Sequence, residues 1–402
     1  MHILLYPQSG PCHSEGSETM KPLSPSMKEH LARYKQHHFD ITCELSEVPG
    51  FSNQEEQRAD WVKKYMEGFG AEGVYIDKAL NVVWPIGVTK DNPVIVMMAH
   101  IDTVFPLDTP LKVVVKDGWA HCPGIGDDTV NVTTMLVVGR YIAEKKLKPA
   151  GDYGVLIVGN AGEEGLGDLK GSKQICGDYA GRIVEFTSFD AGYTGGICND
   201  AVGSHRYRVS VTTEGGHSYV DYGNRNAIAF LTSMIQSLYT VKVPPYGKTT
   251  YNVGGISGGT SVNTIAQNAE MLYEFRSDDR RSLAEMEKMF LSVCDAYRDM
   301  GIGVKVEVLG IRPCRGNVDL GKLEELCLRA QGYIEAYNGP TPYKTRAGST
   351  DANIPLSQGI PAITFGFYIG EGAHTREEKI LIESLDVGLP MCAAYMMQYF
   401  TE

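Results

Sequence analysis

The order of strand-like and helical segments constrains the fold of this 402-residue chain more than any other feature. Helical spacing of apolar residues at 55–69 and 129–144 alternates with short apolar runs at 81–86, 93–99, 154–158 and 183–189. Short apolar runs between amphipathic helices indicate βα units. We therefore expect this part of the chain to form an α/β layer with a mostly parallel sheet.

A different pattern begins near His205. Strands expected at 206–213, 251–256, 270–276 and 303–309 enclose helical patterns at 227–240 and 283–300. This β-α-β-β-α-β order is that of a ferredoxin-like unit. After Pro313 the α/β pattern resumes, with helices at 320–333 and 385–400 around a strand at 362–365.

The pattern thus predicts one α/β domain that carries an inserted smaller domain. Its parts are a mobile leader over 1–26, the first part of the larger domain over 27–205, the inserted domain over 206–313, and the second part of the larger domain over 314–402.

The formal net charge of −12 limits the partners of the chain. Nucleic acids and anionic membranes require basic patches, so neither is expected as the main partner. No apolar run reaches the roughly 18 residues of a membrane span, and the apolar stretch at 3–6 is too short for a signal peptide. The nine cysteines are scattered without a Cys-x-x-Cys pair, which favours a reducing, cytoplasmic location.

Acidic and histidine side chains gather where the expected strands or Gly-rich turns end. These residues are His100, Asp102, Asp127, Asp128, Glu163, Glu164, Asp190 and His374. Open α/β sheets bind their ligands at the carboxyl ends of the strands. Imidazole and carboxylate donors at one such edge favour zinc, although cobalt and manganese also suit this donor set.

The spacing of these residues suggests different roles within a metal site. Residues two apart on an extended chain face the same way, so Asp102 can orient one ring nitrogen of His100 while the other binds metal. Adjacent Glu163 and Glu164 are costly to bury unless a metal neutralises them. One of them can then bind metal while the other takes a proton from water. The alternatives are an exposed acidic loop at 163–164 and a helix cap, rather than a bridging carboxylate, at 127–128.

Five features in a fixed order are jointly specific. They are His-x-Asp at 100–102, Gly-x-Gly-Asp-Asp at 124–128, Glu-Glu-Gly at 163–165, Asp190 at a strand end and His-Thr-x-x-Glu at 374–378. With them, the chain from about residue 45 onward resembles the co-catalytic zinc exopeptidase family of peptidase T, glutamate carboxypeptidase, aminoacylase and succinyl-diaminopimelate desuccinylase. The resemblance implies a three-layer α/β/α catalytic domain with an inserted ferredoxin-like lid and dimerisation domain. It also implies two Zn²⁺ ions per chain and a homodimer formed through the lid.

The resemblance assigns a role to each site residue. The metal ligands would be His100 and Asp190 on one ion, Glu164 and His374 on the other, and Asp127 as the bridge, with a cis Asp127-Asp128 bond. Asp102 would orient His100, Glu163 would be the general base and acid, and His217 would stabilise the oxyanion. The implied substrate contacts are Asn263, Arg276, Gly348 and Ser349. The chain departs from the family at Thr129-Val130, where the family has Lys-Gly. The choice of Asp127 over Asp128 as the bridge rests on the alignment of this segment with the family motif.

The implied reaction is hydrolysis of a peptide or amide bond. A third ligand that is Asp190 rather than glutamate is similar to the peptidase members, which favours an aminopeptidase or di/tripeptidase acting on small peptides. The alternative enzyme is an N-acyl amino acid amidohydrolase with the same metal site. A non-catalytic metal-stabilised binding protein would not explain Glu163, which binds no metal in this scheme. The glycines at 165, 167 and 171 are one residue off a dinucleotide-binding motif.

Overall fold

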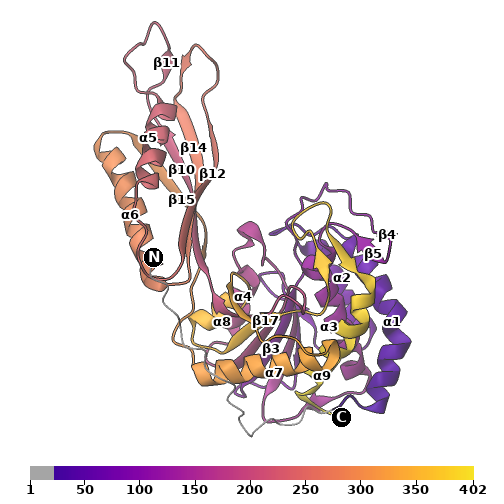
Figure 1. Ribbon diagram of the computed structural model, residues 1–402. Coiled ribbons are helices and arrows are strands. Elements are labelled where there is room, and N and C mark those ends of the chain that lie inside the picture. The colour runs from indigo at the N-terminus through magenta and orange to yellow at the C-terminus, as the bar shows by residue number, and fades with distance from the viewer. Residues whose placement is uncertain (1–21) are drawn as a thin grey trace.

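The computed structural model describes residues 22–402 and shows a larger α/β body from which a narrow lobe projects (Figure 1). The leader predicted over 1–26 falls mostly outside the described residues. Residues 23–26 belong to the fold instead, because helix α1 (Pro25–Ser46) begins at Pro25. The Ser24 hydroxyl caps this helix by accepting a hydrogen bond from the Met27 amide at 3.0 Å, and both Leu23 and Met27 are buried.

The main sheet of the larger body has eight strands in the order β1, β2, β7, β3, β8, β17, β9, β16. Their bounds are β1 (Tyr75–Ile76), β2 (Val82–Ile86), β3 (Val94–His100), β7 (Gly154–Asn160), β8 (Ile183–Phe189), β9 (Ile197–Ala201), β16 (Thr345–Gly348) and β17 (Ala362–Phe365). The neighbours β7, β3, β8 and β17 are parallel. Antiparallel pairing joins β1, β2 and β7, and joins β9 to β17. The parallel sheet expected from the sequence thus forms the centre, while its flanks are mixed.

Helices cover this sheet. The remaining helices of the larger body are α2 (Glu56–Gly68), α3 (Val130–Glu144), α4 (Lys170–Asp178), α7 (Leu320–Asn338), α8 (Asn353–Ser357) and α9 (Leu385–Met397). Helices α1, α3 and α9 pack against one another, and α4 packs against α8. Every residue of β3 and β7 is buried, as expected for central strands that are covered on both faces. No helix in the described part of the chain has both the length and the apolar character needed to cross a membrane.

Short elements complete the larger body. A second, four-stranded sheet has the order β18 (Gly370–Glu371), β19 (Lys379–Leu381), β5 (Trp119–His121), β4 (Val114–Lys116), and β6 (Lys148–Pro149) pairs with β20 (Phe400–Thr401). Helical turns span Ile125–Thr129, Gly165–Gly167 and Ile382–Ser384. The sequence pattern had not predicted the second sheet, because its strands are only two or three residues long.

The projecting lobe has its own sheet and core. Its sheet order is β12 (Thr249–Gly258), β14 (Asn268–Ser277), β10 (Gly203–Thr212), β15 (Gly303–Arg312), with all neighbours antiparallel. Helices α5 (Ala227–Tyr239) and α6 (Arg280–Asp299) enclose a separate hydrophobic cluster that includes Val209, Leu231, Met271 and Phe290. This is the predicted ferredoxin-like order. The short strands β11 (Gly216–His217) and β13 (Thr264–Ile265) pair at the far end of the lobe (Figure 1).

The topology gathers the predicted site residues at one edge of the main sheet. His100 is the last residue of β3, and Asp190 directly follows β8. Glu163 and Glu164 lie three and four residues beyond the end of β7. Because β3, β7 and β8 run parallel, their carboxyl ends meet at one edge, where open α/β sheets bind ligands.

Candidate metal centre

The Asp127 carboxylate lies between two histidines that are 274 residues apart in the sequence. Its Oδ1 is 2.9 Å from Nε2 of His100, and its Oδ2 is 3.1 Å from Nε2 of His374. His374 Nε2 also lies 2.8 Å from Oε1 of Glu164. One carboxylate thus presents one oxygen to each of two imidazoles, which is the arrangement that a bridging ligand of two ions requires.

Two groups of potential ligand atoms share His100. In the first group, ligand atoms of His100, Asp127 and Glu164 lie within 4.8 Å of one another. In the second group, those of His100, Asp128 and Asp190 do so. With His374, whose ring nitrogen contacts Asp127 and Glu164, the structure brings all five predicted ligands into one cluster. The mixed imidazole and carboxylate donors fit zinc-type ions.

The charges in this cluster depend on one another. Burial acts to raise the pKa of Asp127, but hydrogen bonds from His100 and His374 outweigh it and hold that pKa below its usual range. The same contacts with Asp127 and Glu164 raise the pKa of His374 to about 11. Burial raises the pKa of Asp190 to about 6, and the Asp127 charge acts in the same direction. So much negative charge around two imidazoles favours binding of cations.

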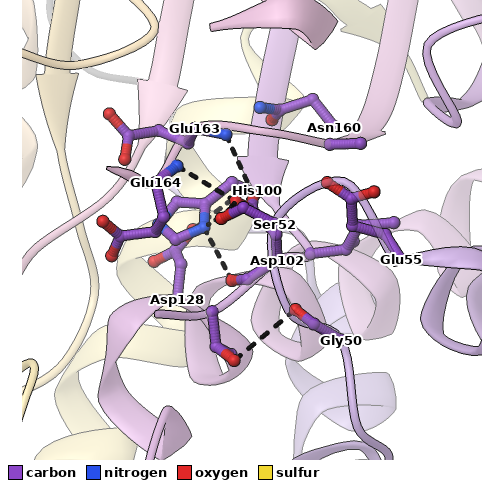
Figure 2. A network of polar contacts seen from close by, with 12 residues as sticks. Gly50, Ser52, Glu55, His100, Asp102, Asp128, Asn160, Glu163 and Glu164 are labelled. Atoms are coloured by element: carbon purple, nitrogen blue, oxygen red, sulfur yellow. Dashed lines mark hydrogen bonds and ion pairs between the residues drawn. The ribbon is translucent and has the colours of Figure 1, made fainter. Parts of the chain in front are cut away.

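Asp102 is the hub of the hydrogen-bond network beside the cluster (Figure 2). Nδ1 of His100 lies 3.1 Å from the carbonyl oxygen of Asp102 and 3.5 Å from its Oδ1. Oδ2 of Asp102 accepts a hydrogen bond from the Ser52 hydroxyl at 2.7 Å. The amides of Glu163 and Glu164 donate to Oδ1 and Oδ2 of Asp102, each at 3.0 Å. Asp102 therefore contacts both the His100 ring and the backbone of the Glu163-Glu164 turn, and both glutamate side chains extend away from it (Figure 2).

The turn that carries Asp127 is held by Glu378, the last residue of the His-Thr-x-x-Glu motif. The Gly124 amide donates to Oε2 of Glu378 at 2.7 Å, and the amides of Gly126 and Asp127 both donate to Oε1 at 2.8 Å. Glu378 is buried, which raises its pKa to about 7 although these three donors act in the opposite direction. The Asp127-Asp128 bond in this turn is cis, as the resemblance implied.

Asp128 is occupied by neighbouring polar groups. Its Oδ2 accepts a hydrogen bond from the His100 amide at 3.1 Å, and its Oδ1 accepts one from Nδ2 of Asn131 at 2.6 Å. Asn131 also donates to the carbonyl of Ala191, which follows Asp190. Asp128 thus links the Asp127 turn to β3 and, through Asn131, to the end of β8. Both of its oxygens thus accept hydrogen bonds from neighbouring groups, whereas the two oxygens of Asp127 face the two histidines.

Glu163 is buried beside the cluster, and its carboxylate contacts an arginine. Oε1 of Glu163 lies 3.4 Å from Nη1 of Arg312. Burial raises the pKa of Glu163 well above its usual value, against the opposing effect of the Arg312 charge. Burial thus favours the protonated form of this carboxyl, and a carboxyl beside a cluster of metal-ligand atoms is placed for proton transfer.

The residues predicted to contact substrate do not lie in one cluster, unlike the predicted metal ligands. Ser349 adjoins Glu163 through Arg312, whose Nη1 lies 3.2 Å from the Ser349 hydroxyl. Gly348 ends β16, and its carbonyl accepts a hydrogen bond from the Val202 amide. Arg276 lies on β14, where it pairs with Glu274. His217 and Asn263 are exposed near β11 and β13, at the end of the lobe remote from β3 in the same chain (Figure 1).

Three further buried polar residues lie near the site, and the sequence assigns no individual role to any of them, although residues 348–351 resemble the family's substrate-binding loop. Arg312 and Glu378 are described above. Asp351 is fully buried, accepts a hydrogen bond from Nδ2 of Asn160 at 2.5 Å, and has its pKa raised to about 7 by burial. Glu378 carries a sequence signal in the His-Thr-x-x-Glu motif, and Asp351 carries one as the last residue of the segment 348–351, whereas nothing in the sequence marks Arg312.

The fold and this donor set are those of a metal-dependent hydrolase of peptide or amide bonds. Residues 96–398 match the peptidase family M20/M25/M40, and the chain belongs to this family.

Three known proteins illustrate the range of the family. Succinyl-diaminopimelate desuccinylase of Corynebacterium glutamicum is 25% identical over 377 residues, which are 90% of this chain and 95% of that protein. A tripeptidase from Staphylococcus aureus, known from its crystal structure, is 22% identical in sequence and superposes with a TM-score of 0.68. The match covers 90% of this chain and 97% of the tripeptidase chain. The Bacillus subtilis YXEP protein, a dinuclear metal binding peptidase, is 16% identical, with a TM-score of 0.60, and covers 92% of this chain and 99% of its own.

Proposed function

We propose that this chain is a dinuclear zinc-dependent exopeptidase that cleaves small peptides as an aminopeptidase or di/tripeptidase. The observation that carries the proposal is the Asp127 carboxylate, which faces His100 with one oxygen and His374 with the other. In this scheme His100 and Asp190 hold one ion, and Glu164 and His374 hold the second. The tripeptidase among the structural neighbours supports the choice of peptides as substrates.

The protein's own residues account for the proton transfers of such a reaction. Bound zinc ions would polarise the scissile carbonyl and lower the pKa of an attacking water. Glu163 accepts the proton of that water and returns it to the leaving amine. Its burial favours this role, because the raised pKa allows the carboxyl to hold the proton between the two transfers. Asp102 keeps the ring of His100 oriented through both transfers.

A test of substrate class uses zinc-loaded protein and a mixture of free tripeptides, N-acetylated amino acids and N-succinylated amino acids. Mass spectrometry of the products is expected to show loss of the first residue from the tripeptides, with no such loss in the Glu163→Gln variant. Cleavage of the acylated compounds alone would replace the peptidase proposal with the second candidate, an N-acyl amino acid amidohydrolase. The desuccinylase relative supports that second candidate.

His217 has the hydrogen bonding that an oxyanion donor requires. Its Nδ1 accepts hydrogen bonds from the amides of Tyr219 at 3.2 Å and Val220 at 3.4 Å. The neutral ring therefore carries its proton on Nε2, which can donate to an oxyanion. Because His217 is remote from the metal cluster of its own chain (Figure 1), we propose that it serves the cluster of a second copy in a homodimer.

Exposed apolar side chains around His217 support such a dimer. Tyr219, Val220, Tyr222 and Val262 are each at least 75% exposed. Apolar side chains concentrated in this way on a surface commonly mark a protein–protein interface.

The eight cysteines of the described residues are all free, which supports a reducing, cytoplasmic compartment.

A complementation assay tests the shared site. The variants His217→Ala and Glu163→Gln are each expected to have little activity. In a C2 dimer each chain would give its His217 to the other chain's site. After subunit exchange at equal amounts, about half of the dimers are mixed, and each mixed dimer has one complete site, on the His217→Ala chain. Activity should therefore return to about one quarter of the wild-type value. A mixture that stays inactive after exchange would exclude a His217 shared between subunits.

A further inference from the structure

Arg312 is the last residue of β15, at the root of the lobe, and its side chain reaches the catalytic edge of the larger body. Nη1 lies 3.4 Å from Oε1 of Glu163, 3.2 Å from the Ser349 hydroxyl and 3.3 Å from the Ser349 carbonyl. Nη2 donates a hydrogen bond to the carbonyl of Glu163. One guanidinium thus contacts both the side chain and the backbone of Glu163.

The root of the lobe also holds the segment that follows Glu163. Arg206, on β10, donates to the carbonyl of Gly165. Lys173 pairs with Asp168 and donates to the carbonyl of Ile311, the residue before Arg312. Arg206 and Lys173 thus bind backbone carbonyls and the Asp168 carboxylate, and neither of them contacts the Glu163 carboxylate. Within residues 22–402, Arg312 is the cation that donates a hydrogen bond to the Glu163 carboxylate.

We propose that Arg312 is a positioning residue that sets the orientation of the Glu163 carboxylate and ties it to the root of the lobe and to the Ser349 loop. This inference rests on the proposed role of Glu163 in proton transfer. Burial argues for positioning rather than substrate contact, because the Arg312 side chain is only 4% exposed. The planar guanidinium suits this task, because its donors lie in a fixed fork that can hold two acceptors at once.

A structural role alone would have a different signature. Arg58 is such a case, because its donors bind the carbonyls of Leu45, Val48 and Ile101 and the Thr129 hydroxyl, with no carboxylate among these partners. Arg312 also binds backbone carbonyls, those of Glu163 and Ser349, but its Nη1 lies in addition 3.4 Å from Oε1 of Glu163. Its Nε is buried with no hydrogen-bond partner among the described residues. The contact with the Glu163 carboxylate is what distinguishes Arg312 from Arg58.

The test compares Arg312→Met and Arg312→Lys with the wild-type protein. We expect Arg312→Met to lower kcat by about 10- to 100-fold, the range for loss of a residue that orients a functional group, with KM and zinc content nearly unchanged. Arg312→Lys keeps the charge but loses the fork, so it should recover only part of kcat. Lys173→Met is the matched control, because it removes an exposed ion pair at the same root without contacting Glu163, and its kcat should stay within about twofold.

A second readout does not depend on turnover. Amide hydrogen exchange of peptides spanning 161–169 in the Arg312→Met variant should rise, while exchange in β3 and β7 stays at the wild-type rate. An unchanged kcat in Arg312→Met, in a protein where Glu163→Gln is inactive, would overturn the positioning role of Arg312. A fully active Glu163→Gln would instead overturn the proposed function, so the two failures are distinguishable. A rise in exchange throughout β3 and β7 would assign Arg312 to the fold and also overturn the proposal.

Discussion

Replacement of Glu163 by glutamine is expected to reduce kcat by about 10² to 10⁴-fold, the usual contribution of a general acid–base residue, while both zinc ions remain bound. The amide has the shape of the carboxylate but cannot accept the water proton. It also leaves the ligand cluster untouched, because the Glu163 carboxylate contacts Arg312 and not the histidines. Steady-state kinetics together with zinc analysis by atomic emission would measure both expectations on the same sample.

The neighbouring residue supplies the control for this prediction. Glu164 lies 2.8 Å from His374 and belongs to the first group of potential ligand atoms. Glu164→Gln is therefore expected to lose zinc as well as activity, and excess zinc should restore part of the activity. If Glu163→Gln loses zinc to the same extent as Glu164→Gln, the division of roles between the two glutamates is wrong.

The sequence predicted the secondary structure well where periodicity was strong. The apolar run before His100 forms the fully buried strand β3, and the alternating pattern after His205 forms β10. The order of the lobe's strands and helices also agrees with the prediction, because each is long enough to show its period. The second sheet of the larger body was missed, since β4, β5, β18 and β19 are too short to carry any periodic pattern.

The site contains residues placed by the strand topology and residues placed by tertiary packing. Parallel strands end at one edge, so residues such as His100 and Asp190 could be expected together from topology alone. The supporting residues could not be predicted in this way. Arg312 meets Glu163 across 149 positions, and Glu378 binds backbone amides, which leave no mark in the identity of the residues that carry them. Contacts of this kind arise from tertiary packing and require the structure.

Replacement of Asp127 by asparagine is expected to weaken zinc binding at both metal positions. Asp127 contributes one oxygen toward each of two histidines, so loss of its charge weakens both metal positions together. We expect zinc affinity at both positions to fall by more than the roughly 10- to 100-fold that loss of a supporting residue costs, and activity to fall below detection at limiting zinc. Titration of the metal-free variant with zinc, followed by a chromophoric chelator, would measure both affinities.

Asp128→Asn distinguishes the bridge from its neighbour. Burial raises the pKa of Asp128 well above its usual value, so the fold already disfavours a charge there. The amide oxygen of asparagine can still accept the hydrogen bond from the His100 amide, although the contact with Asn131 is altered. We therefore expect Asp128→Asn to retain both zinc ions with affinities lowered by at most about 100-fold. The opposite result, with zinc lost in Asp128→Asn and kept in Asp127→Asn, would make Asp128 the bridge and would join His100, Asp128 and Asp190 around one ion.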